Sequence, residues 1–189
     1  MTTQPRFGLE KLSVLIVDDN RHMRALVQSI LHALGIKAIR EAGDAAEAFK
    51  ELQHFSADVI IIDWHMEPLD GLDFVRLVRT AKDSPNPYVP MIMLSGHTEH
   101  QRICDARDAG VNEFLANPIS AKSLYARIIS IIEHPRPFIR TKTYFGPDRR
   151  RQNLGPPRWS EERRKETPGG KNKDAASLSS SDIDALMRK

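Results

Sequence analysis

The chain has 189 residues, of which 28 are Lys or Arg and 25 are Asp or Glu, so its formal net charge is +3. Its single cysteine, Cys104, excludes an internal disulfide and fits a reducing compartment. No apolar run approaches the roughly 20 residues of a membrane-spanning helix, and the first residues lack the apolar core of a secretory signal. These features predict a cytoplasmic protein without a membrane anchor.

The charges are unevenly distributed along the chain. Residues 1–133 contain 14 Lys and Arg against 18 Asp and Glu, a net charge of −4, whereas residues 134–189 contain 14 against 7, a net charge of +7. This asymmetry predicts an acidic globular domain with a basic appendage. We therefore expect an N-terminal extension over 1–10, a domain over 11–134 and a basic tail over 135–189.

Apolar segments of strand length alternate with helical patterns through the first part of the chain. The expected strands are Leu12–Val17, Lys37–Glu41, Val59–Ile62, Met91–Leu94 and Glu113–Leu115. Helical spacing of apolar residues follows each strand, with start and stop signals at Gly35, Asp44, Gly110 and Ser120. Strands that are apolar throughout are typical of a parallel sheet covered on both faces. The pattern predicts a doubly wound α/β fold, a five-stranded parallel sheet with helices on both faces.

Polar residues stand at the ends of four expected strands. They are Asp18, Asp19, Asp63, Ser95 and Asn117. Doubly wound sheets bind ligands at the carboxyl ends of their strands, so we expect these side chains to converge. One or two such aspartates could be merely solvated or helix-capping, but three carboxylates at one edge require a compensating cation. An oxygen-only ligand set suits Mg²⁺ and not zinc or copper.

These motifs resemble those of a response-regulator receiver domain over residues 11–134. The matching segments, in chain order, are LIVDDN, DWHMEPLDG, MLSG and EFLANP. The resemblance implies a flavodoxin-like receiver fold in which Asp63 takes a phosphoryl group from a histidine kinase or phosphotransferase. It implies a phosphoprotein of two-component signalling and not an enzyme.

The resemblance also assigns roles around Asp63. Asp19 and Asp63, with the backbone carbonyl of His65, would hold Mg²⁺, and Asp18 would act mainly through water. A carboxylate is a weak nucleophile, so the ion would offset its repulsion of an incoming phosphate and stabilise the transition state. Ser95 would turn its hydroxyl to a phosphoryl oxygen, and the switch aromatic Phe114 would change rotamer to fill the vacated space.

Two positions depart from the family pattern. Pro68 stands one residue later than usual, which leaves the spacing from Asp63 to Gly71 intact. Asn117 stands where the family almost always has a lysine that pairs with the acceptor carboxylate and then with the phosphoryl group. A hydrogen bond to a charged group contributes ~1.5–3 kcal/mol and a neutral one about 1 kcal/mol, so an uncharged amide should cost roughly 1–2 kcal/mol.

This loss leaves two interpretations open. Phosphorylation of Asp63, or its coupling to the switch, would be weakened; alternatively, the domain is a pseudo-receiver that binds partners without a phosphate cycle. The peptide bond Asn117–Pro118 is a candidate for the cis form, as in the family. His65, His97 and His100 could form a second metal site near this edge, although exposed loop histidines are commoner.

The tail over 135–189 is rich in Pro, Gly, Ser and Arg and has few branched apolar residues. It is expected to be largely disordered when free, because it can bury little surface against its ordering entropy. Tyr144, Phe145 and Trp159 alternate with arginines, which fits a solvated linker, docking on protein, or stacking on nucleic-acid bases. Nucleic-acid binding is not favoured, because the tail has no helix-turn-helix, zinc or winged-helix pattern.

The last residues form a different unit. Ser181 can cap a short helix over 181–188 in which Ile183, Leu186 and Met187 share one face. Such a short helix is not stable alone, so it indicates docking on a surface, in cis or in trans. The segment resembles the D/E-I-D-A-L motif of the flagellar switch protein, which binds the phosphorylated chemotaxis receiver.

Together these features predict a two-component receiver protein whose output is protein–protein contact, in chemotaxis or motility. A receiver-gated nucleic-acid binder is the alternative from another class, and steep salt dependence of its affinity would favour it. An Mg²⁺-dependent phosphatase is disfavoured, because DWHMEPLDG has no second carboxylate two residues after Asp63.

Overall fold

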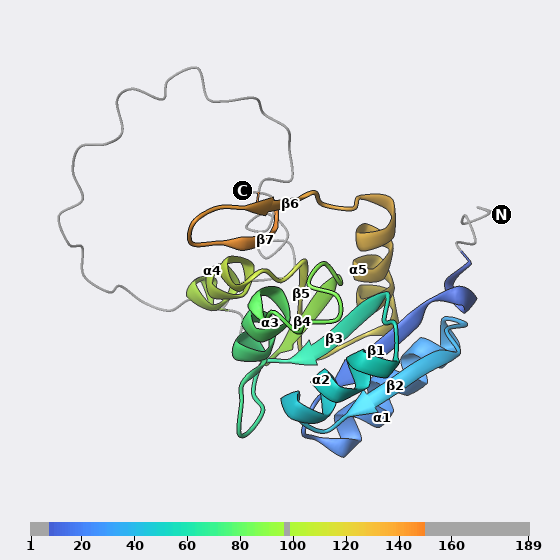
Figure 1. Cartoon of the computed structure of the whole chain (residues 1–189). Coiled ribbons are helices and arrows are strands. Elements are labelled where there is room, and N and C mark those ends of the chain that lie inside the picture. The colour runs from blue at the N-terminus through green and yellow to red at the C-terminus, as the bar shows by residue number, and fades with distance from the viewer. Residues whose placement is uncertain (1–7, 97–98, 150–189) are drawn as a thin grey trace.

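The computed structural model describes residues 8–96 and 99–149. Five parallel strands form its central sheet in the order β2-β1-β3-β4-β5 (Figure 1). These strands are β1 Ser13–Val17, β2 Ala38–Ala42, β3 Val59–Asp63, β4 Met91–Ser95 and β5 Glu113–Ala116. The helices are α1 Arg21–Ala33, α2 Ala45–His54, α3 Gly71–Thr80, α4 His100–Ala109 and α5 Ala121–Glu133, and a 3₁₀ turn, Leu9–Lys11, precedes β1. The predicted doubly wound α/β fold is confirmed.

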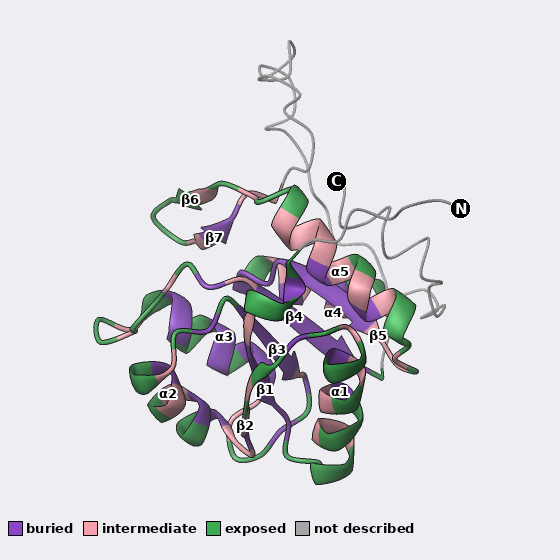
Figure 2. Ribbon diagram, turned by 90° about the vertical axis from the view of Figure 1, so that its right-hand side faces the viewer, coloured by how far each residue is buried: buried purple, intermediate pink, exposed green. Residues whose placement is uncertain are grey.

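Helices cover both faces of the sheet because successive side chains of each strand point to opposite sides. In β1, Leu15 and Val17 pack in the core cluster that includes α2, α3 and α4. Val14 and Ile16 pack in the second cluster, with α1 and α5. Figure 2 shows the buried strands between these two layers of helices, whose outer faces are exposed. None of the helices described over residues 8–96 and 99–149 is long and apolar enough to cross a membrane.

The predicted helix boundaries are set by capping groups. The Asp44 side chain accepts the N–H of Glu47 at the start of α2, and Ser120 forms a capping box with Ser123 at the start of α5. Gly110 ends α4 with a φ of 105°, a conformation that glycine adopts without steric cost. These caps fix the lengths of the loops that leave the strand ends.

Ordered structure continues beyond α5, which corrects the expectation for the first part of the tail. Strands β6 Phe138–Arg140 and β7 Phe145–Pro147 form an antiparallel hairpin, which lies across the top of the domain in Figure 1. The composition of the tail did not predict this hairpin, because the few apolar residues of the hairpin pack on the existing domain and need no core of their own. Residues 150–189, including the helix predicted over 181–188, lie outside the described residues.

An aromatic cluster attaches the hairpin to the loop before β4. The ring centroids of Tyr88 lie 5.2 Å from Phe138 and 5.3 Å from Phe145, and those of Phe138 and Phe145 lie 5.7 Å apart. These separations are in the range of favourable aromatic pairs. The hairpin is therefore packed against the α/β domain and is not merely a connection to the tail.

Beneath the hairpin lies a buried arginine. Arg79, only 2% exposed, donates hydrogen bonds to the carbonyl oxygens of Gly110, Pro87 and Val89 and to the side chain of Asn112. Its Cζ lies 5.0 Å from the centroid of the Phe138 ring. Burial lowers the pKa of Arg79 to about 9, which leaves the guanidinium charged at neutral pH. Phe138 thus covers a cation that joins α3, α4 and the starts of β4 and β5.

Phe138→Ala in the full chain should lower the free energy of unfolding by about 2 kcal/mol. The variant loses partly buried apolar surface, the cation–π contact with Arg79 and two aromatic pairs. Urea denaturation measures this change. The neighbouring Ile139→Ala is the matched control, because Ile139 is exposed and should change stability by no more than about 0.5 kcal/mol. Equal unfolding midpoints for the two variants would contradict a stabilising hairpin.

Candidate functional site

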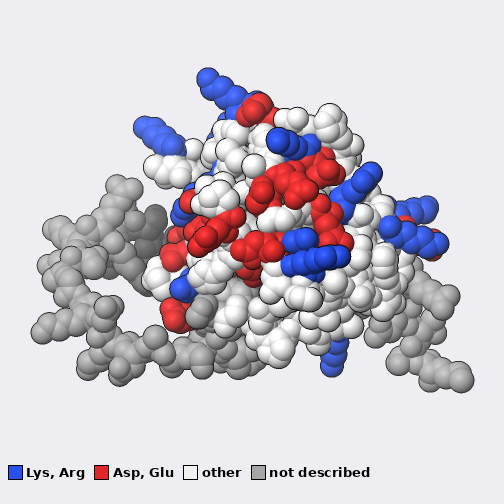
Figure 3. Space-filling view, turned by 90° about the horizontal axis from the view of Figure 1, so that it is seen from below, with Lys and Arg blue, Asp and Glu red and all other residues white. Residues whose placement is uncertain are grey.

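The carboxyl ends of the strands bring the predicted site residues to one edge of the sheet. Asp18 follows β1 and is 3% exposed, Asp63 ends β3 and is half-buried, and Ser95 ends β4 and is fully buried. Asp19 is exposed, and the half-buried Asn117 follows β5. Figure 3 shows acidic side chains gathered on the face at the bottom of Figure 1, with Lys and Arg side chains beside them.

The carboxylates repel one another at this edge. Burial raises the pKa of Asp18 to about 6; the charges of Asp63 and Asp19 act in the same direction, and the N–H of Asn20 and the charge of Arg24 oppose it. Burial also raises the pKa of Asp63 to about 6, against the N–H groups of His65 and Trp64, and Asp19 raises it further. No Lys or Arg among the described residues lowers the pKa of Asp63. The site therefore has an excess of negative charge.

Arg24 partly balances that charge, and sequence reasoning missed it. Its Nη1 donates to the backbone oxygen of Asp18 at 2.6 Å, and its Nε donates to Glu41 at 3.1 Å. The Glu41 pair holds the guanidinium on the β1–β2 side of the site. The available signal was its place in the first turns of the helix that follows the acidic pair.

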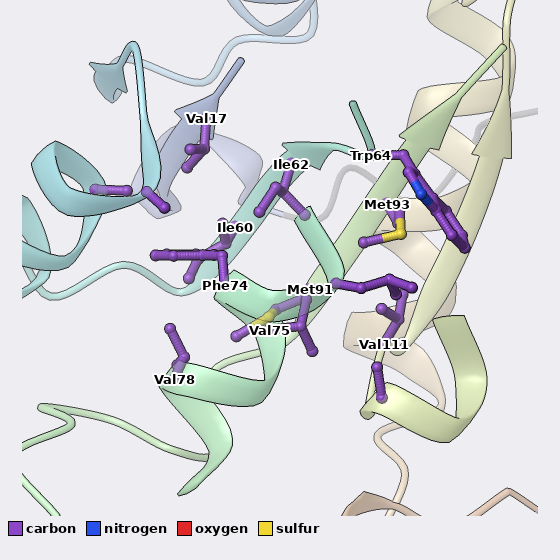
Figure 4. Close-up of a cluster of buried hydrophobic side chains, with 14 of the residues drawn as sticks. Val17, Ile60, Ile62, Trp64, Phe74, Val75, Val78, Met91, Met93 and Val111 are labelled. Carbon is purple, nitrogen blue, oxygen red and sulfur yellow. The ribbon is translucent and has the colours of Figure 1, made fainter. Parts of the chain in front are cut away.

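The loop after Asp63 is held in one conformation. The N–H of His65 donates to Asp63 Oδ2 at 2.9 Å, and the N–H of Gly71 donates to the carbonyl oxygen of Trp64 at 2.9 Å. A Cβ atom at position 71 would overlap the backbone oxygen of Asp63, so only glycine fits there. Trp64 is buried at the end of the core cluster that contains Ile62 and Met93 (Figure 4).

Asn117 occupies the position expected from the sequence but makes no side-chain hydrogen bond to Asp63. Its N–H donates to the backbone oxygen of Ser95 at 2.9 Å. Its Oδ1 is buried and has no hydrogen-bond partner among the described residues. The Asn117–Pro118 bond is cis, as predicted, and so is Glu67–Pro68.

Phe114 lies on β5 and is completely buried. It belongs to the core cluster on the side of α4, together with Met93 of the neighbouring strand. Its predicted change of rotamer remains a prediction.

The donor atoms present fit Mg²⁺, which keeps several of its water molecules, better than a metal ion that is fully enclosed by protein ligands. Over residues 8–96 and 99–149, no three His, Cys, Asp or Glu side chains are grouped so as to hold a metal ion by themselves. Mg²⁺ is usually bound through one or two carboxylates and keeps several water molecules. The exposed Asp19 and the half-buried Asp63, with their uncompensated charge, satisfy that requirement.

Within residues 8–96 and 99–149, His65 and His100 belong to no group of three side chains that could hold a metal ion. His65 lies 3.1 Å from Arg102, measured from Nε2 to Nη1, and His100 lies 3.6 Å from the sulfur of Cys104. Cys104 is a partly buried residue of α4. His97 lies outside the described residues, so its predicted position near the edge remains a prediction.

Comparison with known proteins identifies this arrangement. Residues 14–129 match the response regulator receiver domain family. The chain is 30% identical over 124 residues to chemotaxis protein CheY-3 of Vibrio cholerae, a match that covers 66% of this chain and 94% of the relative. It is 32% identical over 122 residues to chemotaxis protein CheY of Pseudomonas aeruginosa, covering 65% and 97%.

Solved structures agree with this result. Chemotaxis response regulator CheY4 of Vibrio cholerae superposes with a TM-score of 0.58 at 28% identity, covering 64% of this chain and 98% of that one. The CheY of a CheX–CheY–BeF3–Mg²⁺ complex from Borrelia burgdorferi gives a TM-score of 0.57 at 25% identity, covering 64% and 89%. With the motifs and the sheet order 2-1-3-4-5, these matches show that the chain belongs to the response regulator receiver domain family, a non-enzymatic module of two-component signalling.

Proposed function

We propose that the chain is a cytoplasmic two-component response regulator that takes a phosphoryl group on Asp63 and signals through protein–protein contacts. The donor would be a histidine kinase or a phosphotransferase. The observation that carries the proposal is the convergence of Asp18, Asp19, Asp63 and Ser95 at the carboxyl ends of β1, β3 and β4. Phosphoryl transfer to a side chain needs an oxygen nucleophile, a position for a charge-neutralising metal ion and hydrogen-bond donors for the phosphoryl oxygens.

Asp19, Asp63 and the backbone carbonyl of His65 would hold Mg²⁺, and Asp18 would act mainly through water. The bound ion supplies positive charge that offsets the repulsion between a carboxylate and an incoming phosphate. The protein positions the nucleophile itself: the N–H of His65 holds Asp63 Oδ2 at 2.9 Å, which orients the other oxygen for attack on phosphorus. This orientation is obtained before the reaction, so it adds no cost during transfer.

Two further residues act after transfer. Ser95 is enclosed at the end of β4, and its hydroxyl would donate a hydrogen bond to a phosphoryl oxygen. Phe114, enclosed on the adjacent strand, would then change rotamer and alter the surface over β5. Asn117 would weaken this sequence without abolishing it, because an amide donates a hydrogen bond but supplies no charge.

The output would be contact with a chemotaxis or motility protein. Support comes from the relatives, which are chemotaxis proteins, and from a solved relative in complex with CheX. The segment 181–188 would dock as an amphipathic helix, on this receiver or on a partner.

Incubation with Mg²⁺ and acetyl phosphate should add one phosphoryl group to the wild-type protein and none to Asp63→Asn. The substitution removes the nucleophilic oxygen and retains the shape of the side chain. Intact mass measures the product, and omission of Mg²⁺ should also prevent it. A wild-type protein that stays unmodified would favour the pseudo-receiver interpretation.

Asn117→Lys should raise the rate of phosphorylation by acetyl phosphate several-fold. A lysine restores the ammonium that pairs with the acceptor carboxylate, and a charged hydrogen bond contributes roughly 1 kcal/mol more than a neutral one. Asn117→Gln is the control, since it keeps the amide and adds length without charge. Equal rates for the lysine and glutamine variants would show that charge at this position is unimportant.

Deletion of residues 178–189 should change amide chemical shifts in the folded domain if the terminal segment docks in cis. Substitution of Ile183 and Leu186 by serine should reproduce the changes, because it removes the apolar face and retains the chain. Ala185→Ser, outside that face, should have little effect. Unchanged shifts across residues 8–149 on deletion would exclude docking in cis.

A further inference from the structure

A positively charged side chain approaches the phosphoacceptor loop from the side that Asn117 leaves uncharged. Arg102 belongs to α4, the helix that connects β4 with β5. Its Cζ lies 5.4 Å from the centroid of the Trp64 ring, and its Nη1 lies 3.1 Å from Nε2 of His65. Trp64 and His65 are the two residues that directly follow Asp63.

The present contacts of Arg102 are of kinds that can be replaced by contacts with a phosphoryl group. A guanidinium has only hydrogen-bond donors, so Nε2 of His65 must be the acceptor, and this ring is on an exposed residue. The ion pair between Arg102 and Glu99 is 3.7 Å long, with side chains 28% and 47% exposed. An exposed pair of this length is weak. A phosphoryl group with two negative charges would compete effectively for the guanidinium.

The other arginine of the site is less available. Arg24 donates to the backbone oxygen of Asp18 at 2.6 Å and to Glu41 at 3.1 Å. Its ion pair with Glu41 is more shielded, with side chains 18% and 33% exposed. It also stands beside β1 and β2, whereas Asn117 follows β5 at the opposite side of the sheet. Arg102, from α4, lies on the side where the family's lysine would stand.

We propose that Arg102 supplies the positive charge that Asn117 lacks. When Asp63 is phosphorylated, the guanidinium leaves the His65 ring and donates hydrogen bonds to phosphoryl oxygens. The inference rests on the proposed function, since it requires a phosphoryl group on Asp63. It assigns Arg102 a direct contact with the product of transfer.

The transfer step balances without a further reactant. With acetyl phosphate, a carboxylate oxygen of Asp63 forms a bond to phosphorus while the bond from phosphorus to the acetate oxygen breaks. Acetate leaves with the electron pair of that bond, and no proton is gained or lost. The phosphoryl oxygens keep their charge throughout, so a guanidinium can contact them both before and after transfer. Its planar fork suits two such oxygens at once.

A double-mutant cycle tests this role. The proteins are the wild type, Arg102→Gln, Asn117→Lys and the variant with both substitutions, each incubated with Mg²⁺ and acetyl phosphate and followed by intact mass. Arg102→Gln should lower the phosphorylation rate about tenfold, as expected when a charged hydrogen bond is lost. In the Asn117→Lys background the same substitution should change the rate by less than about twofold, since the lysine then provides the charge.

Arg107→Gln is the matched control. Arg107 lies on the same helix and pairs with Asp108 at 3.3 Å, so its loss removes a charge from α4 without affecting the acceptor loop. Arg102→Lys should retain part of the rate. An equal effect of Arg102→Gln in both backgrounds, or an effect no larger than that of Arg107→Gln, would overturn the proposed role.

NMR of the arginine Nε–Hε groups provides a measurement that would stay unchanged if Arg102 had only a structural role. The Arg102 signal should shift on phosphorylation of the wild type, because its partner changes from an imidazole ring to a phosphoryl group. An unchanged Arg102 signal on fully phosphorylated protein would overturn the inference and leave the proposed function intact. Absence of phosphoprotein in the wild type and all variants would overturn both.

Discussion

Repulsion between carboxylates at one edge of the sheet is the constraint on which the rest of the site depends. The parallel register places Asp18 and Asp63 at the ends of neighbouring strands, and burial raises the pKa of each to about 6. Charge of the opposite sign must therefore come from elsewhere. That requirement explains the position of Arg24 and the fit of the site to Mg²⁺. It also explains why a further positive charge is expected near Asn117.

The cations of this receiver are distributed differently from those that its family pattern implies. Arg24 stands at the β1–β2 side, where its hydrogen bond to the Asp18 backbone also orders the acidic loop. The β5 side has an amide whose Oδ1 lacks a partner among residues 8–96 and 99–149. A guanidinium from α4 would make the response depend on the position of that helix. Phosphorylation would then act directly on α4, whereas a lysine at position 117, after β5, would act on α4 only through that strand.

The sequence predicted the features that depend on local pattern. Apolar strands ending in Asp18, Asp63 and Ser95 indicated both the fold and the site edge, because parallel strands place their ends together. The contacts of Arg24 with Glu41 and of Arg102 with His65 could not be predicted in this way, since the partners are remote from each other in the chain. The orientation of the Asn117 amide likewise depends on packing that no local pattern describes.

The hairpin was missed for a related reason and has a consequence for signalling geometry. It covers Arg79 beside Gly110 and Asn112, at the amino ends of β4 and β5, so Arg149 leaves the domain on the side opposite Asp63. The packing of Phe138 and Phe145 on Tyr88 fixes the direction in which the polypeptide leaves α5. The chain beyond Arg149 therefore starts from the side of the domain opposite the acidic edge, and the hairpin leaves the carboxyl ends of β1, β3 and β4 uncovered.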